Sequence, residues 1–269
     1  MTSLQRVDEW PVEHAAAAVV TASGTTTHGE DARRFPLASV TKLLVTVAAL
    51  LAVEEEAITL DEPAGPEGST VRHLLAHTSG LAFSEQRVMA EPGTRRLYSS
   101  AGFEVLADHL AARTGIAFAD YLHEAVCEPL GLTSTTLDGS PGHGATSTLA
   151  DLARFAAELR VPTLLAAETM AEATTVQFPG LDGVLPGLGH QKPNDWGLGF
   201  ELRDHKSPHW TGASSSPGTF GHFGQSGTFV WVDPDAGAAC VVLTDRDFGD
   251  WAKEAWPAFT DAVLAELAD

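Results

Sequence analysis

The chain has 269 residues, 44% of them hydrophobic and 19% charged, which is enough apolar material for one large domain or two interleaved ones. Its 16 basic and 36 acidic residues give a formal charge of −20, which repels nucleic acid and anionic lipid and argues against both as partners. Residues 1–13 lack the basic start and apolar centre of a secretory signal, and the longest apolar run, residues 43–53, is too short to span a bilayer. We therefore expect a cytoplasmic protein.

The N-terminal quarter predicts a hairpin followed by a buried helix. Residues 15–21 are small and β-branched, residues 25–28 are again strand-like, and a Ser-Gly turn separates them. A helix is predicted from Ser39 through the apolar run, and it ends in the three glutamates at 54–56. Residues 61–68 hold two prolines and two glycines, which predicts a loop.

The middle of the chain, residues 61–173, predicts helices and loops without a strand. The predicted helices share apolar residues at helical spacing together with start or stop signals: 71–76, 103–114, 118–127, 148–159 and 162–173. Thr148 with Asp151 resembles a capping box at the start of the fourth of them, and Gly115 ends the second.

The C-terminal part returns to strands. Residues 196–202, 228–232 and 238–244 each read as a strand, and a turn rich in Asp, Pro and Gly joins the last two into a hairpin. A final helix is predicted within residues 251–267, with Pro257 in its first turn or at a kink. Strands near both ends of the chain with helices between them predict an α+β (mixed α/β) fold.

This order of elements predicts two interleaved domains. Residues 1–60 and 175–269 would form a discontinuous sheet domain, and residues 61–174 an inserted, mainly helical domain. A cleft between the two is the natural place for a binding site. Its walls are expected from the irregular segments 81–87 and 179–196.

The pattern S-x-x-K at Ser39 and Lys42 brings a hydroxyl and an amine onto one face of the predicted helix. A serine hydroxyl is a poor nucleophile until a neighbouring base takes its proton, so Lys42 must be neutral part of the time. Its apolar neighbours in the sequence predict a desolvated side chain, which lowers a lysine pKa. The alternative is a helix cap at Ser39 and a surface lysine with a buried stem. The short pattern recurs by chance, so the catalytic interpretation depends on partners elsewhere.

Three further stretches supply such partners: residues 73–81 (HLLAHTSGL), 98–100 (YSS) and 222–224 (HFG). Together with S-x-x-K, and in this order, they resemble the motifs of the serine β-lactamase and penicillin-binding-protein superfamily. The match is to its class C β-lactamase-like branch, which also holds esterases and D-amino-acid peptidases. The resemblance covers residues 35–246. It implies a β-lactamase/transpeptidase-like fold, in which helices flank an antiparallel sheet and an all-helical domain is inserted.

The resemblance also implies a role for each matching residue. Ser39 would be the acylated nucleophile, Lys42 its general base or proton relay, and Tyr98 a second base that passes a proton to the leaving group. The backbone N–H groups of Ser39 and Gln225 would form an oxyanion hole, worth on the order of 3 kcal/mol per donor. A nucleophile, two proton carriers and two fixed donors are sufficient for acyl transfer.

Two positions depart from the family pattern. Ser100 stands where the tyrosine motif usually has Asn, and Phe223 stands where the K-T-G motif has Thr or Ser. His222 replaces the Lys of that motif and, with Gly224, gives the H-x-G variant of esterase-like members. The expected oxyanion and substrate-binding groups are His222, Gly224, Gln225 and Ser100. The lost amide and hydroxyl should weaken recognition of a β-lactam or an acyl-D-Ala terminus, whereas ester cleavage needs neither.

No cofactor, metal ion or phosphate-binding loop is expected. His73 and His77 have a spacing that can bind zinc, but no Glu lies between them and no third ligand is evident, so we expect structural roles for both. His205 and His209 share that spacing in a loop-like stretch.

The sequence as a whole predicts a serine hydrolase that works through an acyl-enzyme on Ser39, with esterase-like activity on small acyl substrates as the leading hypothesis. A β-lactamase or a D-alanyl-D-alanine carboxypeptidase would use the same mechanism. A ligand-binding module that kept the fold and lost turnover is the alternative from another class, because Ser100 and Phe223 depart from the pattern. In each case the partner is a small molecule, and the natural acyl group and the oligomeric state stay open.

Overall fold

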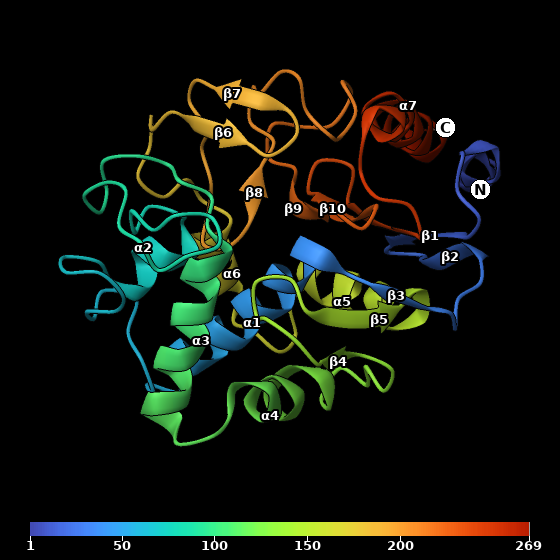
Figure 1. Cartoon of the computed structure of the whole chain (residues 1–269). Coiled ribbons are helices and arrows are strands. Elements are labelled where there is room, and N and C mark those ends of the chain that lie inside the picture. Colours follow the sequence, from blue (N-terminus) through green and yellow to red (C-terminus); the bar gives the residue numbers. More distant parts are fainter. Residues whose placement is uncertain (269) are drawn as a thin grey trace.

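A six-stranded antiparallel sheet organises residues 1–268, which the computed structural model describes (Figure 1). The strand order is β2-β1-β11-β10-β9-β8. The strands are β1 (Ala15–Thr21), β2 (Gly24–Gly29), β8 (Glu201–Leu202), β9 (Phe220–Gly224), β10 (Thr228–Asp233) and β11 (Ala238–Thr244). Because β1 pairs with β11, the first and last strands of the sequence lie side by side within one sheet. The predicted fold class and both predicted hairpins are confirmed.

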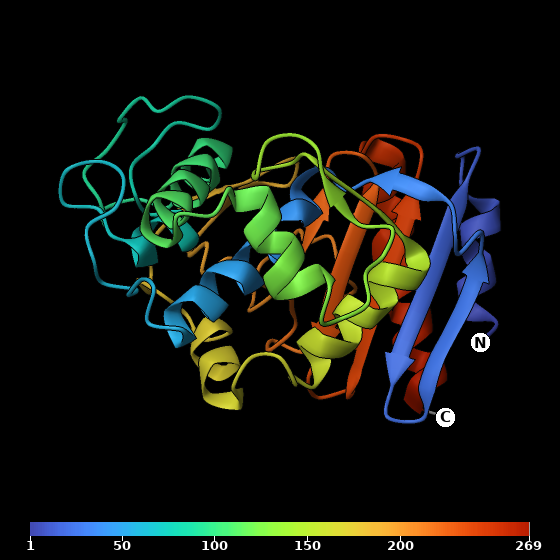
Figure 2. The same ribbon diagram turned by 90° about the horizontal axis from the view of Figure 1, so that it is seen from below.

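The two faces of this sheet are each covered by helices. These are η1 (Ser3–Glu9, a 3-10 helix), α1 (Thr41–Glu54), α5 (Leu149–Arg160) and α7 (Asp250–Ala268). Successive side chains of a strand point to opposite faces. Val230 and Val232 accordingly pack in the core that α1 and α5 form, whereas Phe229 and Trp231 pack with α7 and η1. Figure 2 shows the sheet between α5 on one side and α7 on the other.

Besides α5, five helical segments lie in the part of the chain between residues 61 and 174. They are α2 (Val71–Leu75), α3 (Ser100–Thr114), α4 (Phe118–Leu122), the π-helical turn η3 (His123–Cys127) and α6 (Ala167–Ala173). Capping residues mark several helix ends. The Thr70 side chain accepts an N–H at the start of α2, and Thr148 does so at the start of α5. Gly115 ends α3 in a left-handed conformation, with φ 73°.

Helix α1 is buried on all sides rather than along one face. Residues 41–52 are buried, including Lys42 with 0% of its surface exposed. The helix contacts β9 of the sheet as well as α3 and α4. One turn of 3-10 helix, η2 (Ala38–Val40), precedes it and carries Ser39. The predicted S-x-x-K helix is therefore confirmed. Within residues 1–268, no helix is both long enough and apolar enough to cross a membrane.

The prediction that residues 61–173 contain no strand is wrong. β4 (Thr136–Leu137) and β5 (Ala145–Thr148) join β3 (Arg34–Pro36) in a separate three-stranded antiparallel sheet. β5 lies in its middle, between β3 and β4. These strands are short and polar, and they are extended because they pair with a segment that is remote in sequence. Local residue preferences therefore gave no signal for them.

The strand predicted over residues 196–202 is wrong except at its end, where β8 lies. The preceding backbone serves two helix ends instead. Leu198 donates its N–H to the carbonyl of Ala173 at the end of α6, at 2.8 Å, and Gly199 donates to that of Leu75 at the end of α2, at 3.0 Å. Helix ends have carbonyl groups without partners in the helix, so this segment satisfies them and cannot also pair as a strand.

Helix α6 begins at Ala167 rather than at the predicted Pro162, because a buried carboxylate holds the backbone between them. Glu158, in the last turn of α5, accepts the N–H groups of residues 163–165 at 2.8 to 3.2 Å. With these donors satisfied outside a helix, the chain can turn between α5 and α6 before the helix starts.

Helix α5 falls within the predicted helical insertion but packs on β1 and β11 of the main sheet. The domain boundaries near residues 60 and 174 therefore stay a prediction. The segment 179–196, predicted to be irregular, contains a small hairpin of β6 (Gly183–Leu185) and β7 (Gly189–Gln191).

Replacing Glu158 with alanine should destabilise the fold, because the N–H groups of residues 163–165 lose their acceptor. An unsatisfied buried donor costs about 1–3 kcal/mol, and relaxation recovers part of this, so we expect the free energy of unfolding to fall by roughly 2–4 kcal/mol in urea denaturation. Glu168→Ala, at an exposed glutamate in α6, is the control and should cost less than about 1 kcal/mol. Equal effects of the two substitutions would contradict the assigned role.

Candidate active site

The side chains singled out by the sequence motifs meet at the first turn of α1. Ser39 lies in η2, Tyr98 precedes α3, and His222 lies in β9. All three line a cavity of about 310 Å³, and Lys42 is fully buried beside Ser39. The fold thus brings together residues from three separate stretches of the sequence.

The Lys42 amine has three hydrogen-bond partners. Its Nζ lies 2.7 Å from the carbonyl oxygen of Gly142, 3.0 Å from Ser100 Oγ and 3.4 Å from Ser39 Oγ. Burial lowers its pKa to about 7, and Glu104 acts in the opposite direction. In its neutral form the amine can donate to the carbonyl and to Ser100 while its lone pair faces the Ser39 hydroxyl. This arrangement suits Lys42 to take the Ser39 proton near neutral pH.

Ser100 and Gly142 hold this amine, and sequence reasoning identified only the first. Ser100 is buried, and its hydroxyl is engaged with Lys42. Gly142 lies in the loop between β4 and β5, where a Cβ would be 2.8 Å from the Cβ of Ser100. Only glycine therefore lets this carbonyl approach Lys42. In the sequence, Pro141-Gly142 signals a turn but not this contact.

Tyr98 and His222 form a second hydrogen-bonded pair. The Tyr98 hydroxyl lies 3.1 Å from His222 Nε2, and His222 Nδ1 lies 2.6 Å from the carbonyl oxygen of Phe223. A carbonyl can only accept, so Nδ1 carries the imidazole proton and Nε2 accepts from the phenol. Burial and the nearby Lys42 lower the pKa of His222 to about 3, so the ring is neutral. Burial raises the pKa of Tyr98, and a hydrogen bond with Ser39 acts in the opposite direction.

Packing fixes the Tyr98 ring. The ring centroid of His77 lies 4.5 Å from that of Tyr98, and that of Trp196 lies 5.6 Å away. His77 Nδ1 also accepts the N–H of Ser99 at 3.2 Å, which ties it to the start of α3. His73 bonds to the capping side chain of α2. These contacts agree with the structural roles predicted for the two histidines.

The end of β9 lies directly against the turn that carries Ser39. A Cβ at Gly224 would be 2.3 Å from the carbonyl oxygen of Leu37, so glycine is required for this approach. The carbonyl of Gln225 then accepts the N–H of Phe248 at 2.7 Å, which fixes the turn after β9. Gln225 also lines the cavity, next to Ser39. The oxyanion hole expected from these two residues stays a prediction.

A buried ionic cluster borders the cavity, and no motif in the sequence indicated it. Glu201 contacts Lys206, and its carboxylate lies 2.8 Å from His209 Nε2 and 2.9 Å from Trp210 Nε1. Burial alone would raise the pKa of Glu201, but His209 and Lys206 lower it to about 2. The cluster ties the loop after β8 to the cavity wall. It also separates the predicted histidine pair, since His205 is exposed and His209 is buried.

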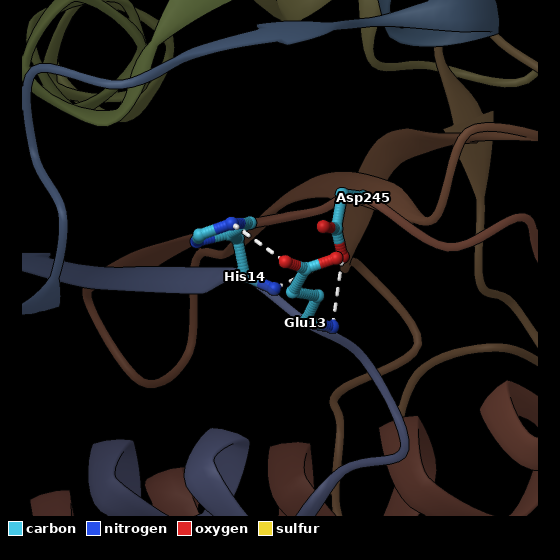
Figure 3. A group of neighbouring side chains, drawn as sticks. All are labelled: Glu13, His14 and Asp245. Carbon is cyan, nitrogen blue, oxygen red and sulfur yellow. Dashed lines mark hydrogen bonds and ion pairs between the residues drawn. The ribbon is translucent and has the colours of Figure 1, made fainter.

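Within residues 1–268, one group of three acidic or histidine side chains has potential ligand atoms within 4.8 Å of one another: Glu13, His14 and Asp245 (Figure 3). Hydrogen bonds explain this grouping. Asp245 Oδ1 accepts the backbone N–H groups of Glu13 and His14 at 3.1 and 3.0 Å. His14 Nδ1 lies 2.9 Å from Glu30. These bonds join the start of β1 to the end of β11, and the group does not line the cavity at Ser39.

Over nearly its whole length, the chain is similar to known proteins. Residues 8–264 match the family model described as Beta-lactamase. The crystal structure of a β-lactamase from Mycobacterium bovis is similar to this chain, with 63% sequence identity and a TM-score of 0.97, and the match covers 98% of this chain and 99% of that one.

More distant structures share the fold. Simvastatin synthase (LovD) from Aspergillus terreus, in a mutant form, is 19% identical with a TM-score of 0.80, over 99% of this chain and 94% of its own. EstCE1, a hydrolase with promiscuous acyltransferase activity, is 19% identical with a TM-score of 0.80, over 97% and 96%. D-alanyl-D-alanine-carboxypeptidase/endopeptidase AmpH from Escherichia coli (strain K12) is 25% identical over 142 residues, which are 39% of this chain and only 37% of AmpH.

The rate at which an active-site-directed phosphonate modifies Ser39 should rise with pH and level off above about 7, because only neutral Lys42 accepts the Ser39 proton. His222 is already neutral and Tyr98 still protonated in this range, so neither adds a second step. Mass spectrometry measures the labelling rate from mildly acidic to alkaline pH. Lys42→Arg stays protonated throughout and should label about 100-fold more slowly, without the rise. A flat profile for the native protein would exclude Lys42 as the base.

Gly142→Ala should slow the same reaction without unfolding the protein. The added Cβ displaces the loop from Ser100, so the Lys42 amine loses its acceptor at 2.7 Å and its fixed position. We expect a loss of roughly 10-fold to 100-fold in labelling rate, typical of a small misplacement of a catalytic group. His143→Ala, at the exposed neighbouring residue, is the control and should keep the native rate. Equal rates for Gly142→Ala and the native protein would show that the carbonyl does not position the amine.

Proposed function

The chain belongs to the β-lactamase family and is a serine hydrolase, and we propose that it acts as an esterase on small acyl substrates through an acyl-enzyme on Ser39. The observation that carries the proposal is the buried Lys42 amine, 3.4 Å from Ser39 Oγ and with its pKa lowered to about 7. A hydroxyl beside a base that is partly neutral at physiological pH is an activated nucleophile.

Acylation would proceed in two steps. Ser39 Oγ attacks the ester carbonyl carbon while its proton passes to Lys42 Nζ, and the backbone N–H groups of Ser39 and Gln225 stabilise the oxyanion that forms. The tetrahedral intermediate then expels the alcohol, which takes the phenolic proton of Tyr98. That transfer is downhill, because an alkoxide is more basic than a phenolate. The Lys42 ammonium, 4.7 Å from the centre of the Tyr98 ring, stabilises the phenolate until it is reprotonated.

Deacylation would use the same groups in reverse. A water molecule attacks the acyl carbon from the cavity side, and its proton passes to the Tyr98 phenolate, or to neutral Lys42 if Lys42 has already reprotonated Tyr98. Ser39 Oγ is the leaving group and regains its proton from Lys42. While Tyr98 is protonated, its hydrogen bond to neutral His222 orients the phenol.

The contacts of three residues favour esters over β-lactams. The Ser100 hydroxyl is occupied by Lys42. Phe223 packs against Phe248, with ring centroids 4.8 Å apart, and presents only an apolar wall to the cavity. His222 is neutral, so it offers no positive charge to a carboxylate next to the scissile bond, as the Lys of a K-T-G motif would.

Hydrolysis of β-lactams is the second candidate function. It is favoured by the similarity, at 63% identity over nearly the whole chain, to a protein described as a β-lactamase. D-alanyl-D-alanine carboxypeptidase activity has weaker support, because the match to AmpH covers only 37% of that protein.

Parallel assays of p-nitrophenyl acetate and a chromogenic cephalosporin test the ranking. We expect ester turnover to exceed cephalosporin turnover and to fall at least about 1000-fold in Ser39→Ala, because the nucleophile is lost. Ser226→Ala is the matched control: its hydroxyl bonds to the carbonyl of Pro36 near the same turn, and its loss should leave turnover intact. Rapid cephalosporin hydrolysis without ester hydrolysis would reverse the ranking. Failure of a phosphonate to add its mass to Ser39 would indicate a non-catalytic binding module.

A further inference from the structure

A second, larger cavity adjoins the catalytic one and has no part in the mechanism above. Its volume is about 780 Å³, against about 310 Å³ for the cavity at Ser39. Phe83, Tyr98 and Pro186 line both, so the two are direct neighbours with a shared wall. We call the larger cavity the antechamber. It is bounded by residues 81–89 and 94–98 and by β6. Its size is typical of a pocket for a drug-sized ligand.

The antechamber has an apolar rim. Across residues 1–268, the large apolar side chains that are more than half exposed are Phe83, Val88, Met89, Val161 and Val184, at 52 to 58%. Three of these line the antechamber, and Val88 adjoins it beside Met89. Clustered exposure of this kind marks a surface that binds an apolar partner, whereas single exposed apolar residues need no explanation.

The walls of the antechamber are anchored rather than loose. Phe83 is held at its carbonyl by the N–H groups of Ser100 and Ala101, at 2.8 and 3.1 Å, at the start of α3. Arg96 is fully buried and donates to the carbonyls of Asn194 and Gln177, at 3.0 and 2.7 Å, which fixes the opposite wall. A preformed pocket loses less conformational entropy on binding.

The charge around the antechamber is opposite to that of the whole chain. The chain carries −20, yet Arg87 and Arg95 line this cavity, and Asp182 is the one carboxylate among its lining residues. Within residues 1–268, no carboxylate lies within 4.0 Å of the Arg95 guanidinium. Arg87, by contrast, is paired with Glu85. Arg87 and Glu85 lie 3.3 Å apart, and their side chains are 62% and 66% exposed, so this ion pair is weak. A local excess of guanidinium groups favours an anionic group on the ligand.

We propose that the antechamber binds the larger part of the substrate, an apolar chain that ends in a carboxylate, while the ester carbonyl lies beside Ser39. This inference rests on the proposed esterase function and specifies its substrate class. The carboxylate lies at the far end of the chain, near Arg87 and Arg95. It is thus distinct from the carboxylate of a β-lactam, which would lie next to the scissile bond and neutral His222.

Matched esters test the charge. We compare kcat/KM for mono-p-nitrophenyl suberate and for its neutral methyl ester, p-nitrophenyl methyl suberate. The native enzyme should prefer the charged ester by about fivefold, and Arg95→Gln should abolish most of that preference, as expected for a partly exposed ion pair. Arg6→Gln is the control. It removes the same charge at an exposed residue of η1, which packs against α7, and should keep the native ratio. Equal kcat/KM values for the two esters in the native enzyme would overturn the proposal.

A second comparison tests the apolar rim. The ratio of kcat/KM for p-nitrophenyl methyl suberate to that for p-nitrophenyl acetate should fall about threefold or more in Val184→Ser, since part of the chain loses its apolar contact. Val161→Ser replaces an equally exposed valine at the end of α5 and should leave the ratio unchanged. Equal ratios in the two variants would contradict binding of the chain at the rim.

Binding measured without turnover separates this inference from the proposed function. Calorimetry with decanoate and the Ser39→Ala protein should show saturable binding that Arg95→Gln weakens several-fold. That result supports the antechamber even if no ester is hydrolysed. Ester hydrolysis that depends on Ser39, together with no decanoate binding, would reject the antechamber and leave the hydrolase in place. A concentration-dependent dimer that Val184→Ser dissolves, with decanoate binding unaffected, would assign the rim to self-association and reject the contact of the chain with Val184.

Discussion

The chemistry of this protein depends on an amine that is removed from water. Lys42 lies in the first turn of a helix that is buried on all sides, and its three partners come from η2, from α3 and from the loop between β4 and β5. Burial lowers its pKa to about 7, against the opposing effect of Glu104. The sheet, the short helices and the small second sheet are all needed to enclose this one group, which explains why the residues around it are drawn from most of the chain.

Within the enclosed site, charges are arranged so that one group titrates near neutral pH. The pKa of His222 is lowered to about 3 by burial and by Lys42, and that of Tyr98 is raised by burial. Glu201 keeps its negative charge through Lys206 and His209. Positive charge available to a ligand therefore lies outside the catalytic cavity, at the arginines of the antechamber. This distribution links the mechanism to the shape of substrate that the site favours.

The sequence predicted the parts of this structure whose signals are local. The S-x-x-K helix, the two hairpins and the helix caps follow from periodicity and capping residues within a few positions. Gly142 and Glu201 were missed because their roles arise from contacts that are remote in sequence and lack a motif. The same cause underlies the missed strands β4 and β5, which form only against β3. Residues of both segments predicted as cavity walls, 81–87 and 179–196, line the antechamber, but the hairpin in the second segment, the contribution of residues 94–98 and the charge of the walls were not predicted.

The burial of Lys42 has a consequence for the robustness of the fold. Below about pH 7 the side chain is protonated in both the folded and the unfolded chain, so the folded state bears the full cost of a desolvated ammonium. Between about 7 and 10.5 the unfolded chain still binds a proton that the folded chain has released, so this cost shrinks as the pH rises. A pKa lowered from 10.5 to about 7 corresponds to something on the order of 5 kcal/mol. The apolar packing of α1 has to outweigh that penalty. The burial that makes Lys42 a base near neutral pH therefore also lowers the stability of the fold.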